Sequence, residues 1–255
     1  MSDFEREVAE RVATNRSNED LRDSARAFMN SSIAALYSYN FTALGRPIIQ
    51  YPQDIVAMQE LIWEVRPDVI VETGIAHGGS LILSASLLAL LDYCDALEAG
   101  ELLDPAQPKR RVVAVDIDIR AHNRAAIEAH SMANRIEMIQ GSSVDPAIVD
   151  EVKRKVGDAG RVLVSLDSNH THDHVLAELE AYAALVTPES YCVVFDTIVE
   201  DLPEDAFDDR PWGRGDNPKT AVHKYLETHP EFEIDTSIDD KLLISVAPSG
   251  FLRRK

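Results

Sequence analysis

From residue 67 onward, short runs of β-branched and other apolar residues alternate with amphipathic stretches of helical length. Most of these runs are almost continuously apolar, which is typical of strands buried on both faces of a parallel sheet. The expected strands are residues 69–72, 112–116, 136–140, 162–167 and 191–196. The expected helices are residues 80–91, 121–132, 146–156, 173–186 and a helix that begins at Pro218. This alternation predicts an α/β domain.

Two further strands are expected near the C-terminus, at residues 232–237 and 242–246. The few residues between them cannot hold a parallel crossover, so the pair should form an antiparallel hairpin. Together, these segments predict a doubly wound, mostly parallel, seven-stranded α/β sheet with an antiparallel C-terminal hairpin. Residues 1–45 are expected to form an N-terminal helical extension, and residues 46–255 the α/β domain. The acidic segment 92–109 is expected to be an inserted loop.

The charge balance limits the partners of such a domain. Lys and Arg total 25 against 44 Asp and Glu, which gives a formal net charge of −19 at pH 7. Nucleic-acid binding is therefore not expected, since phosphate contacts require a basic surface. The longest apolar stretch, residues 80–91, is shorter than the ~20 residues of a membrane span, and the acidic N-terminus does not resemble a signal peptide. We expect a cytoplasmic protein in which Cys94 and Cys192 are reduced thiols.

The residues that end each strand carry most of the functional information, because ligands of open α/β sheets bind beyond the carboxyl ends of the strands. After the first strand, Gly74, Gly78 and Gly79 fall within six residues. Ser80 is placed to cap the helix that follows. Such a glycine-rich turn lets a ligand approach the backbone closely. The same residues would equally form a tight strand-to-helix turn that binds no ligand. Both interpretations stay open at this point.

Asp116 ends the second strand, where a nucleoside-binding sheet places an acid against the ribose hydroxyls. The alternative role of Asp116 is to cap the next helix. The third strand ends in Gly141, Ser142 and Ser143, small residues that suit a purine packed on the backbone. A nicotinamide dinucleotide is disfavoured, because the glycines do not read G-x-G-x-x-G and Asp116 lies 37 residues after Gly79, rather than ~20.

The fourth and fifth strands end in Asp167 and Asp196, which neighbouring strand ends would bring within reach of one ion. Their oxygen ligands suit Mg²⁺ or another divalent cation such as Ca²⁺. Helix capping and loop hydrogen bonds are the alternative roles of these aspartates. Histidines follow Asp167, but zinc is not expected without a nearby cysteine. We expect His170 or His172 to be catalytic or to touch substrate, and His174 to lie on the helix surface.

A long acidic segment, residues 200–217, follows the fifth strand. Acidic runs are usually solvated surface. A segment of this length at the ligand end of the sheet, with Arg210, Trp212 and Arg214, is better interpreted as a lid over the substrate. The lid supplies few apolar residues for packing. Trp212 is an apolar platform of the kind on which sugars stack, and a hydrophobic plug is the alternative.

Several of these segments together resemble the cephalosporin hydroxylase/rhamnosyl O-methyltransferase family. They are residues 50–52 (Gln-Tyr-Pro), 72–74 with 78–80, 116–120 with 122–124, 141–143, 166–172 and 210–213. The resemblance runs from about residue 45 to residue 255. It implies a class I methyltransferase fold that uses S-adenosylmethionine, often with Mg²⁺, on hydroxyls of sugars or natural products. We therefore expect an O-methyltransferase with a small-molecule or glycan acceptor, such as a rhamnosyl-type glycan or glycolipid, and a homo-oligomer.

The resemblance also implies roles for individual residues. It places Glu72 and Gly74 against the methionine part of the cofactor, Asp116 on its ribose, and Ser142 and Ser143 near its adenine. The full set of expected cofactor-binding residues is Glu72, Gly74, His77, Gly78, Ser80, Asp116, Ser142, Ser143 and Asp167. The expected metal ligands are Asp167, Asp196 and Thr197, although relatives can carry an acid or amide at the last position.

For the chemistry, we expect the enzyme to position donor and acceptor and to help deprotonate the acceptor hydroxyl. His170 or His172, beside Asp167, is expected to accept the proton, unless a metal-bound alkoxide needs no base. The expected substrate contacts are Tyr51, Arg210, Trp212 and Arg214. One rival is a metal-dependent hydroxylase of a β-lactam-like metabolite, with His170, His172 and Asp167 around iron. The other rival is a non-catalytic module that binds S-adenosylmethionine.

Overall fold

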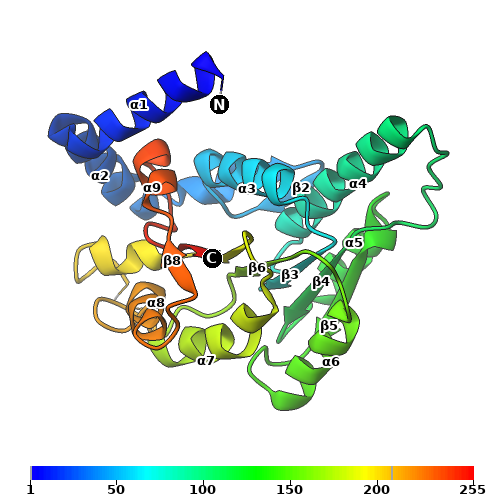
Figure 1. Cartoon of the computed structure of the whole chain (residues 1–255). Coiled ribbons are helices and arrows are strands. Elements are labelled where there is room, and N and C mark those ends of the chain that lie inside the picture. The colour runs from blue at the N-terminus through cyan, green and yellow to red at the C-terminus, as the bar shows by residue number, and fades with distance from the viewer. Residues whose placement is uncertain (1, 208) are drawn as a thin grey trace.

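A computed structural model describes residues 2–207 and 209–255, and Figure 1 shows a central sheet between helices. The sheet has seven strands in the order β5-β4-β3-β6-β7-β9-β8. They are β3 (Val69–Thr73), β4 (Arg111–Asp116), β5 (Ile136–Gln140), β6 (Val162–Leu166), β7 (Tyr191–Val194), β8 (Phe232–Ile234) and β9 (Phe251–Arg254). The strands from β3 to β7 pair in parallel, whereas β9 is antiparallel to both β7 and β8. The expected doubly wound, mostly parallel sheet with antiparallel C-terminal strands is confirmed.

The strand order reverses beside β3, which lies between β4 and β6. Strands β4 and β5 lie on one side of β3, and the next two strands along the chain, β6 and β7, lie on its other side. Thr73 at the end of β3 pairs with Val115 of β4 and with Leu166 of β6, so the three strand ends are level. Residues just beyond these strands therefore meet at the topological switch point, where open α/β sheets bind ligands.

The central strands place alternate residues on opposite faces of the sheet, which explains why their sequences are almost wholly apolar. On one face, Ile70 and Leu163 belong to an apolar cluster with α3 (Pro52–Val65), α4 (Gly79–Ala99) and α5 (Ala121–Glu128). On the other, Val71 and Val164 cluster with α6 (Pro146–Val156), α7 (His172–Tyr182) and α8 (Pro218–Leu226). Figure 1 shows these helical layers on opposite sides of the sheet.

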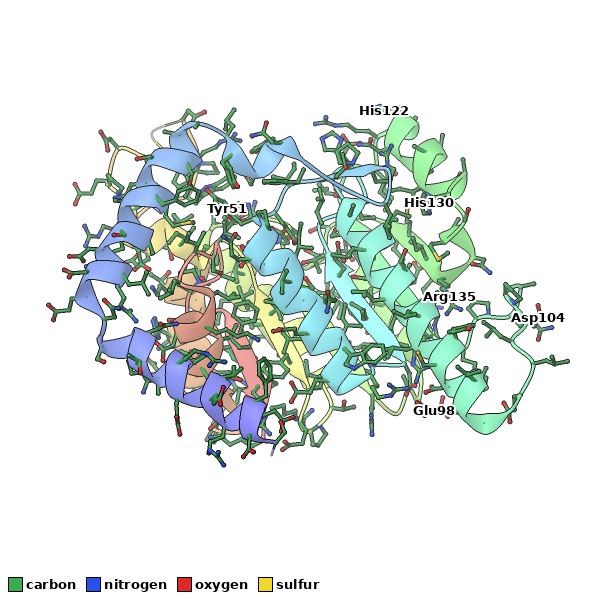
Figure 2. All side chains as sticks on the ribbon, turned by 90° about the horizontal axis from the view of Figure 1, so that it is seen from above. Tyr51, Glu98, Asp104, His122, His130 and Arg135 are labelled. Carbon is green, nitrogen blue, oxygen red and sulfur yellow. The ribbon has the colours of Figure 1, made fainter. Side chains whose placement is uncertain are left out.

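Helix α4 continues well past the expected end, so the first part of the segment 92–109 is helical. The added turns include Asp92, which is fully buried and accepts hydrogen bonds from Arg110 and Arg135. Gly100 then ends the helix in the left-handed conformation, with a φ of +66°. The remaining residues form the expected loop, and Figure 2 shows Asp104 far out on it.

Among the described residues, α4 is also the one helix that is long and apolar enough to cross a membrane by length and composition. The expectation that no apolar segment reaches that length is therefore wrong for this helix. Its side chains nevertheless pack in the protein interior, since Leu81, Leu88 and Leu91 are fully buried in the apolar cluster on one face of the sheet. This burial identifies α4 as a core helix.

The C-terminal strands are antiparallel as expected, but the second strand lies elsewhere. β8 pairs with β9, and the residues between them include the short helix α9 (Thr236–Leu242). Asp235 caps this helix by accepting a hydrogen bond from the backbone of Ser237. The apolar run 242–246 is mostly a loop, because Ser245 and Val246 donate hydrogen bonds to the buried carboxylate of Asp54 on α3. The expected hairpin over residues 232–246 is therefore wrong.

The N-terminal region contains α1 (Asp3–Ser17) and α2 (Glu19–Ala34), followed by an antiparallel pair of short strands, β1 (Phe41–Ala43) and β2 (Arg46–Ile48). Ser2 and Glu5 form a capping box at the start of α1. Figure 1 shows α1 beside α9, where Arg16 forms an ion pair with Asp240. The helices expected before residue 45 are present, and the division of the chain at that residue stays a prediction.

Candidate active site

Four acidic residues end or follow neighbouring parallel strands: Glu72 in β3, Asp116 in β4, Asp167 after β6 and Asp196 after β7. The carboxyl ends of these strands meet at one edge of the sheet. Potential ligand atoms of Asp167, His170 and Asp196 all lie within 4.8 Å of one another. His170 Nε2 lies 3.5 Å from Asp196 Oδ2. The structure therefore brings the two aspartates together and adds the imidazole of His170; we call these three residues the carboxylate cluster.

The electrostatics of the carboxylate cluster favour a cation. Burial raises the pKa of Asp167 well above its ordinary range, and the nearby carboxylates of Asp196 and Glu72 raise it further. Burial also raises the pKa of Glu72 from 4.5 to about 7, although the hydrogen bond donated by Ser80 opposes this shift. Carboxylates this close repel each other when both are ionised. A divalent cation between Asp167 and Asp196 would remove the repulsion, so the donor set fits a metal ion.

The backbone at Asp196 adopts the left-handed region, with a φ of +55°. Residues other than glycine rarely adopt this conformation, and they often do so at functional sites. The turn leads into a 3-10 helix, Thr197–Asp201, and buries the side chain of Thr197. The Thr197 hydroxyl donates a 2.8 Å hydrogen bond to the carbonyl of Pro248. Thr197 is thus engaged within the protein, and its role as a metal ligand stays a prediction.

The turn after β3 needs two of its glycines for packing within the protein. Gly74 has a φ of +90°, and a Cβ atom there would lie 1.9 Å from the carbonyl oxygen of Asp167. A Cβ atom on Gly79 would lie 2.3 Å from the carbonyl oxygen of Pro47. Both approaches are too close for any side chain, so the tight turn is required by the fold itself. The contact of Gly74 with a cofactor stays a prediction.

Ser80 does not cap α4, contrary to expectation. Gly78 occupies the N-cap position, and the Ser80 hydroxyl instead donates a hydrogen bond to the buried carboxylate of Glu72. The carbonyl of His77 accepts hydrogen bonds from the guanidinium of Arg46, which ties the turn to β2. The cofactor-binding roles of His77, Gly78 and Ser80 stay predictions.

Asp116 holds the same turn from the end of β4. Its Oδ2 accepts hydrogen bonds from the backbone N–H groups of Ile75 at 2.8 Å and Ala76 at 3.2 Å, and its Oδ1 accepts one from Asp118 at 2.9 Å. It does not cap α5, because Arg120 occupies the N-cap position. A carboxylate has about four acceptor positions. Oδ1 therefore retains a position for a ribose hydroxyl, and the ribose role stays a prediction.

A hydrogen-bond network that sequence reasoning missed joins the ends of β5 and β6. His174 Nε2 lies 3.1 Å from Ser143 Oγ and 3.2 Å from Ser168 Oγ, and Ser168 donates a 2.6 Å hydrogen bond to the fully buried Glu178. The expectation that His174 lies on the helix surface is wrong, because its ring contacts both strand ends. The signal in the sequence is the i, i+4 pair of His174 and Glu178 beside the apolar stripe of α7. The adenine contacts of Ser142 and Ser143 stay predictions.

The structure separates the two histidines considered as bases. His170 belongs to the carboxylate cluster, whereas His172 Nδ1 lies 2.8 Å from the hydroxyl of Thr220 on α8. The backbone N–H of His172 also donates a 2.6 Å hydrogen bond to Asp216. The iron site considered for a hydroxylase needs both histidines beside Asp167, and within the described residues the cluster contains His170 alone.

Tyr51, an expected substrate contact, lies in the core. It is 1% exposed, and its hydroxyl lies 2.8 Å from Ser32 Oγ on α2. Its ring packs against the rings of Phe28 and Tyr37. Figure 2 shows Tyr51 at the start of α3, beside the N-terminal helices. Tyr51 therefore anchors α2 to α3, and its contact with substrate stays a prediction.

The segment 200–217 is attached to the rest of the domain at both ends. Leu202 is buried and Phe207 packs against the core, so the expectation of little apolar packing is wrong for these residues. Near its end, the buried amide of Asn217 donates hydrogen bonds to Glu200 at 2.5 Å and to the carbonyl of Gly213 at 2.9 Å. The closure of the segment 200–217 over a substrate stays a prediction.

Trp212 borders the carboxylate cluster. Its ring centroid lies 4.7 Å from that of His170, with the planes at 89°, an edge-to-face arrangement. The guanidinium of Arg210 lies 5.6 Å from the Trp212 ring. Arg214 instead lines a neighbouring cavity of about 540 Å³. The substrate contacts of these three residues stay predictions.

The architecture defines the class of protein first. A solved structure of CmcI, described as holding Mg and SAM, superposes with a TM-score of 0.54 and 18% identity, over 85% of this chain and 77% of that chain. At this level of identity the likeness concerns the fold, which is the Rossmann-like fold of class I methyltransferases.

Sequence similarity then gives the family. The chain belongs to the Rhamnosyl O-methyltransferase/CmcI family of S-adenosylmethionine-dependent O-methyltransferases, whose model matches residues 35–255. The rhamnosyl O-methyltransferase of Mycobacterium tuberculosis H37Rv is 28% identical over 79% of this chain and 73% of its own length. That of Mycobacterium leprae is 27% identical over 84% of this chain and 83% of its own length.

Proposed function

We propose that this O-methyltransferase methylates a hydroxyl of a sugar, in a rhamnosyl-type glycan, a glycolipid or a natural product, with the help of Mg²⁺ or another divalent cation. The observation that carries the proposal is the carboxylate cluster of Asp167, His170 and Asp196 at the strand ends. The mycobacterial relatives, which are named rhamnosyl O-methyltransferases, support a sugar as the acceptor.

The acids at the ends of β3 and β4 suit the methyl donor. S-adenosylmethionine carries an ammonium group, and an ammonium beside Glu72 would compensate the burial that raises the pKa of this carboxyl to about 7. Asp116 keeps an acceptor position on Oδ1 for a ribose hydroxyl while its other positions hold the glycine turn. These contacts support a donor at the ends of β3 and β4, next to the carboxylate cluster.

Asp167 and Asp196 would hold the cation, with His170 able to complete its ligand set. Two carboxylates suit Mg²⁺, and a nearby imidazole also allows Mn²⁺. When bound, the sulfonium donor supplies the methyl group and the cation supplies positive charge beside the acceptor oxygen.

His170 receives the acceptor proton in this proposal when it does not ligate the cation. Asp196, 3.5 Å from His170 Nε2, orients the ring for this role. Trp212 packs edge-on against His170 and shields the site from water on that side. The chain thus contributes positioning, proton transfer and exclusion of water, which are the requirements of an in-line methyl transfer.

The test is transfer of labelled methyl groups to nucleotide sugars, rhamnosides and glycolipids, with Mg²⁺ or with excess EDTA. We expect a methylated sugar whose formation requires the cation, and we expect Asp167→Asn to abolish it. Asp150→Asn, on the exposed face of α6, is the matched control and should leave turnover unchanged. Full activity in EDTA would refute the metal role. Failure to methylate any sugar would refute the acceptor class.

The role of His170 has its own comparison in the same assay. His170→Ala is expected to lower kcat about 10²- to 10⁴-fold while leaving S-adenosylhomocysteine affinity unchanged. His172→Ala is expected to change kcat much less, because the His172 ring contacts Thr220. Equal losses in the two variants would contradict the assignment of the base to His170.

A further inference from the structure

The cavity of about 540 Å³ that Arg214 lines lies between α2, the segment after β7, α8 and the loop after α9. Its volume falls in the range of small-molecule sites. Helix α2 contributes Arg22, Arg26 and Met29 to the lining. Figure 1 shows α2 close to α9 at this end of the molecule. The N-terminal extension therefore forms one wall of a ligand-sized cavity.

None of the three residues of the carboxylate cluster lines the cavity, but the chain shortly after Asp196 does. Its lining includes Ile198, two residues after Asp196, and Pro248, whose carbonyl accepts the hydrogen bond from Thr197. An acceptor that presents a hydroxyl to the cluster would therefore reach this cavity by extending past Asp196 toward Ile198.

Basic side chains gather around this cavity, although the whole protein has a formal net charge of −19. Two of the cations have partners from other elements. Lys219 Nζ lies 2.6 Å from Asp201, and Arg22 lies 3.3 Å from the buried Asp240. These pairs stabilise the walls and leave less of their charge for a ligand.

Two other cations are freer to meet a ligand. Within the described parts of the chain, Arg214 has no ion-pair partner inside 4.0 Å, although it lies near enough to Glu200 to help lower the pKa of that carboxyl. Arg26 pairs with Asp23, one turn earlier on α2, and both side chains are mostly exposed. Exposed pairs of this kind contribute little free energy, so an anionic ligand can displace Asp23 at small cost.

The acids that line the cavity are engaged in the fold. Glu200 accepts hydrogen bonds from the backbone of Gly215 at 2.8 Å and from the amide of Asn217 at 2.5 Å. Asp239 accepts a 2.9 Å hydrogen bond from the backbone of Ser249, and burial raises its pKa to about 6. The protein thus holds each carboxylate through one oxygen, Oε2 of Glu200 and Oδ2 of Asp239. Arg26 and Arg214 are the cations of the lining that are best placed to meet an anionic ligand.

We propose that this cavity binds an anionic group of the acceptor, a phosphate or a carboxylate, through Arg26 and Arg214. The proposal rests on the proposed function, because it assigns the cavity to the acceptor of the methyl group. The family match begins at residue 35, whereas Arg26 precedes it. The N-terminal extension is thus a specificity element of this chain, which selects a charged acceptor from outside the part shared with the family.

The test is calorimetry with inorganic pyrophosphate and with citrate at low ionic strength, in EDTA so that metal-mediated binding does not contribute. We expect one of these anions to bind the parent protein, and the double variant Arg26→Ala/Arg214→Ala to bind it about tenfold more weakly. The double lysine variant keeps the charges and should regain most of the affinity. Binding of pyrophosphate indicates a phosphate on the acceptor, and binding of citrate indicates a carboxylate.

Arg11→Ala is the matched control, because Arg11 lies on α1, pairs with Glu7 and is outside the cavity lining. It should leave anion affinity unchanged, and all variants should keep the melting temperature and the S-adenosylhomocysteine affinity of the parent. The proposal is overturned if neither anion binds the parent, or if the double alanine variant binds as tightly as the parent. Failure of the parent to bind S-adenosylhomocysteine would instead contradict the proposed function, whatever the anions do.

Discussion

Substitution Glu72→Gln separates the energetic cost of a buried acid from its use in binding a ligand. Glu72 is 3% exposed, and burial raises the pKa of its carboxyl from 4.5 to about 7. This difference of roughly 2.5 in pKa corresponds to about 3 kcal/mol of the free energy of unfolding. Glutamine has nearly the same shape and accepts the same hydrogen bond from Ser80, but it cannot ionise. The glutamine variant therefore lacks the loss of folding free energy that comes from burying an ionisable carboxyl.

The sign of the effect follows from which state ionises first. Well below pH 4.5 the carboxyl is protonated in both the folded and the unfolded chain, and it costs nothing. As the pH rises, the unfolded chain loses its proton first, so the folded state becomes less stable until the pH passes about 7. About 2.5 kcal/mol of this loss should fall between about pH 5 and about pH 8. We expect Glu72→Gln to remove that part of the pH dependence.

The assay is urea unfolding of parent and variant, without ligand, across this pH range. The new amide N–H groups of glutamine lack known partners and cost about 1–3 kcal/mol, but equally at every pH. Glu98→Gln, at the exposed end of α4 in Figure 2, is the matched control and should change stability by less than about 0.5 kcal/mol throughout. A constant difference between Glu72→Gln and the parent across the range would refute the reasoning.

The same variant tests whether Glu72 contacts the methyl donor. Glutamine cannot pair ionically with the ammonium of the donor, so we expect S-adenosylhomocysteine to bind Glu72→Gln about tenfold more weakly. Calorimetry at neutral pH measures this directly. Unchanged affinity together with the expected loss of pH dependence would mean that Glu72 does not touch the donor.

Two further substitutions probe neighbouring parts of the site. Asp116→Ala is expected to weaken S-adenosylhomocysteine binding by about 1.5–3 kcal/mol in calorimetry, and to lower the melting temperature because the N–H groups of Ile75 and Ala76 lose their acceptor. Unchanged affinity would remove Asp116 from the ribose site. Trp212→Ala is expected to raise the acceptor KM about tenfold without changing donor affinity. Lost thermal stability with unchanged kinetics would instead identify Trp212 as a hydrophobic plug.

The amino-acid sequence by itself determined the five parallel strands of the sheet and the edge at which their acids meet. Strands such as β3 and β6 are apolar on both faces, so their runs identify them without any knowledge of their neighbours. Asp167 and Asp196 could be placed together because parallel strands all end at the same edge. The segments 72–80 and 166–172 likewise carry the family resemblance in consecutive residues. Each of these conclusions depends on local order along the chain.

The tertiary structure decided the different roles of residues that are neighbours in the sequence. His170 and His172 are two positions apart, yet the packing of α7 against α8 directs His172 to Thr220 and leaves His170 with the carboxylates. The run 242–246 is as apolar as a strand, but Asp54, which is 191 positions from Ser245, holds it as a loop. A pattern read along the chain contains no information on such partners. Their choice follows from the need to satisfy buried polar groups across the folded core.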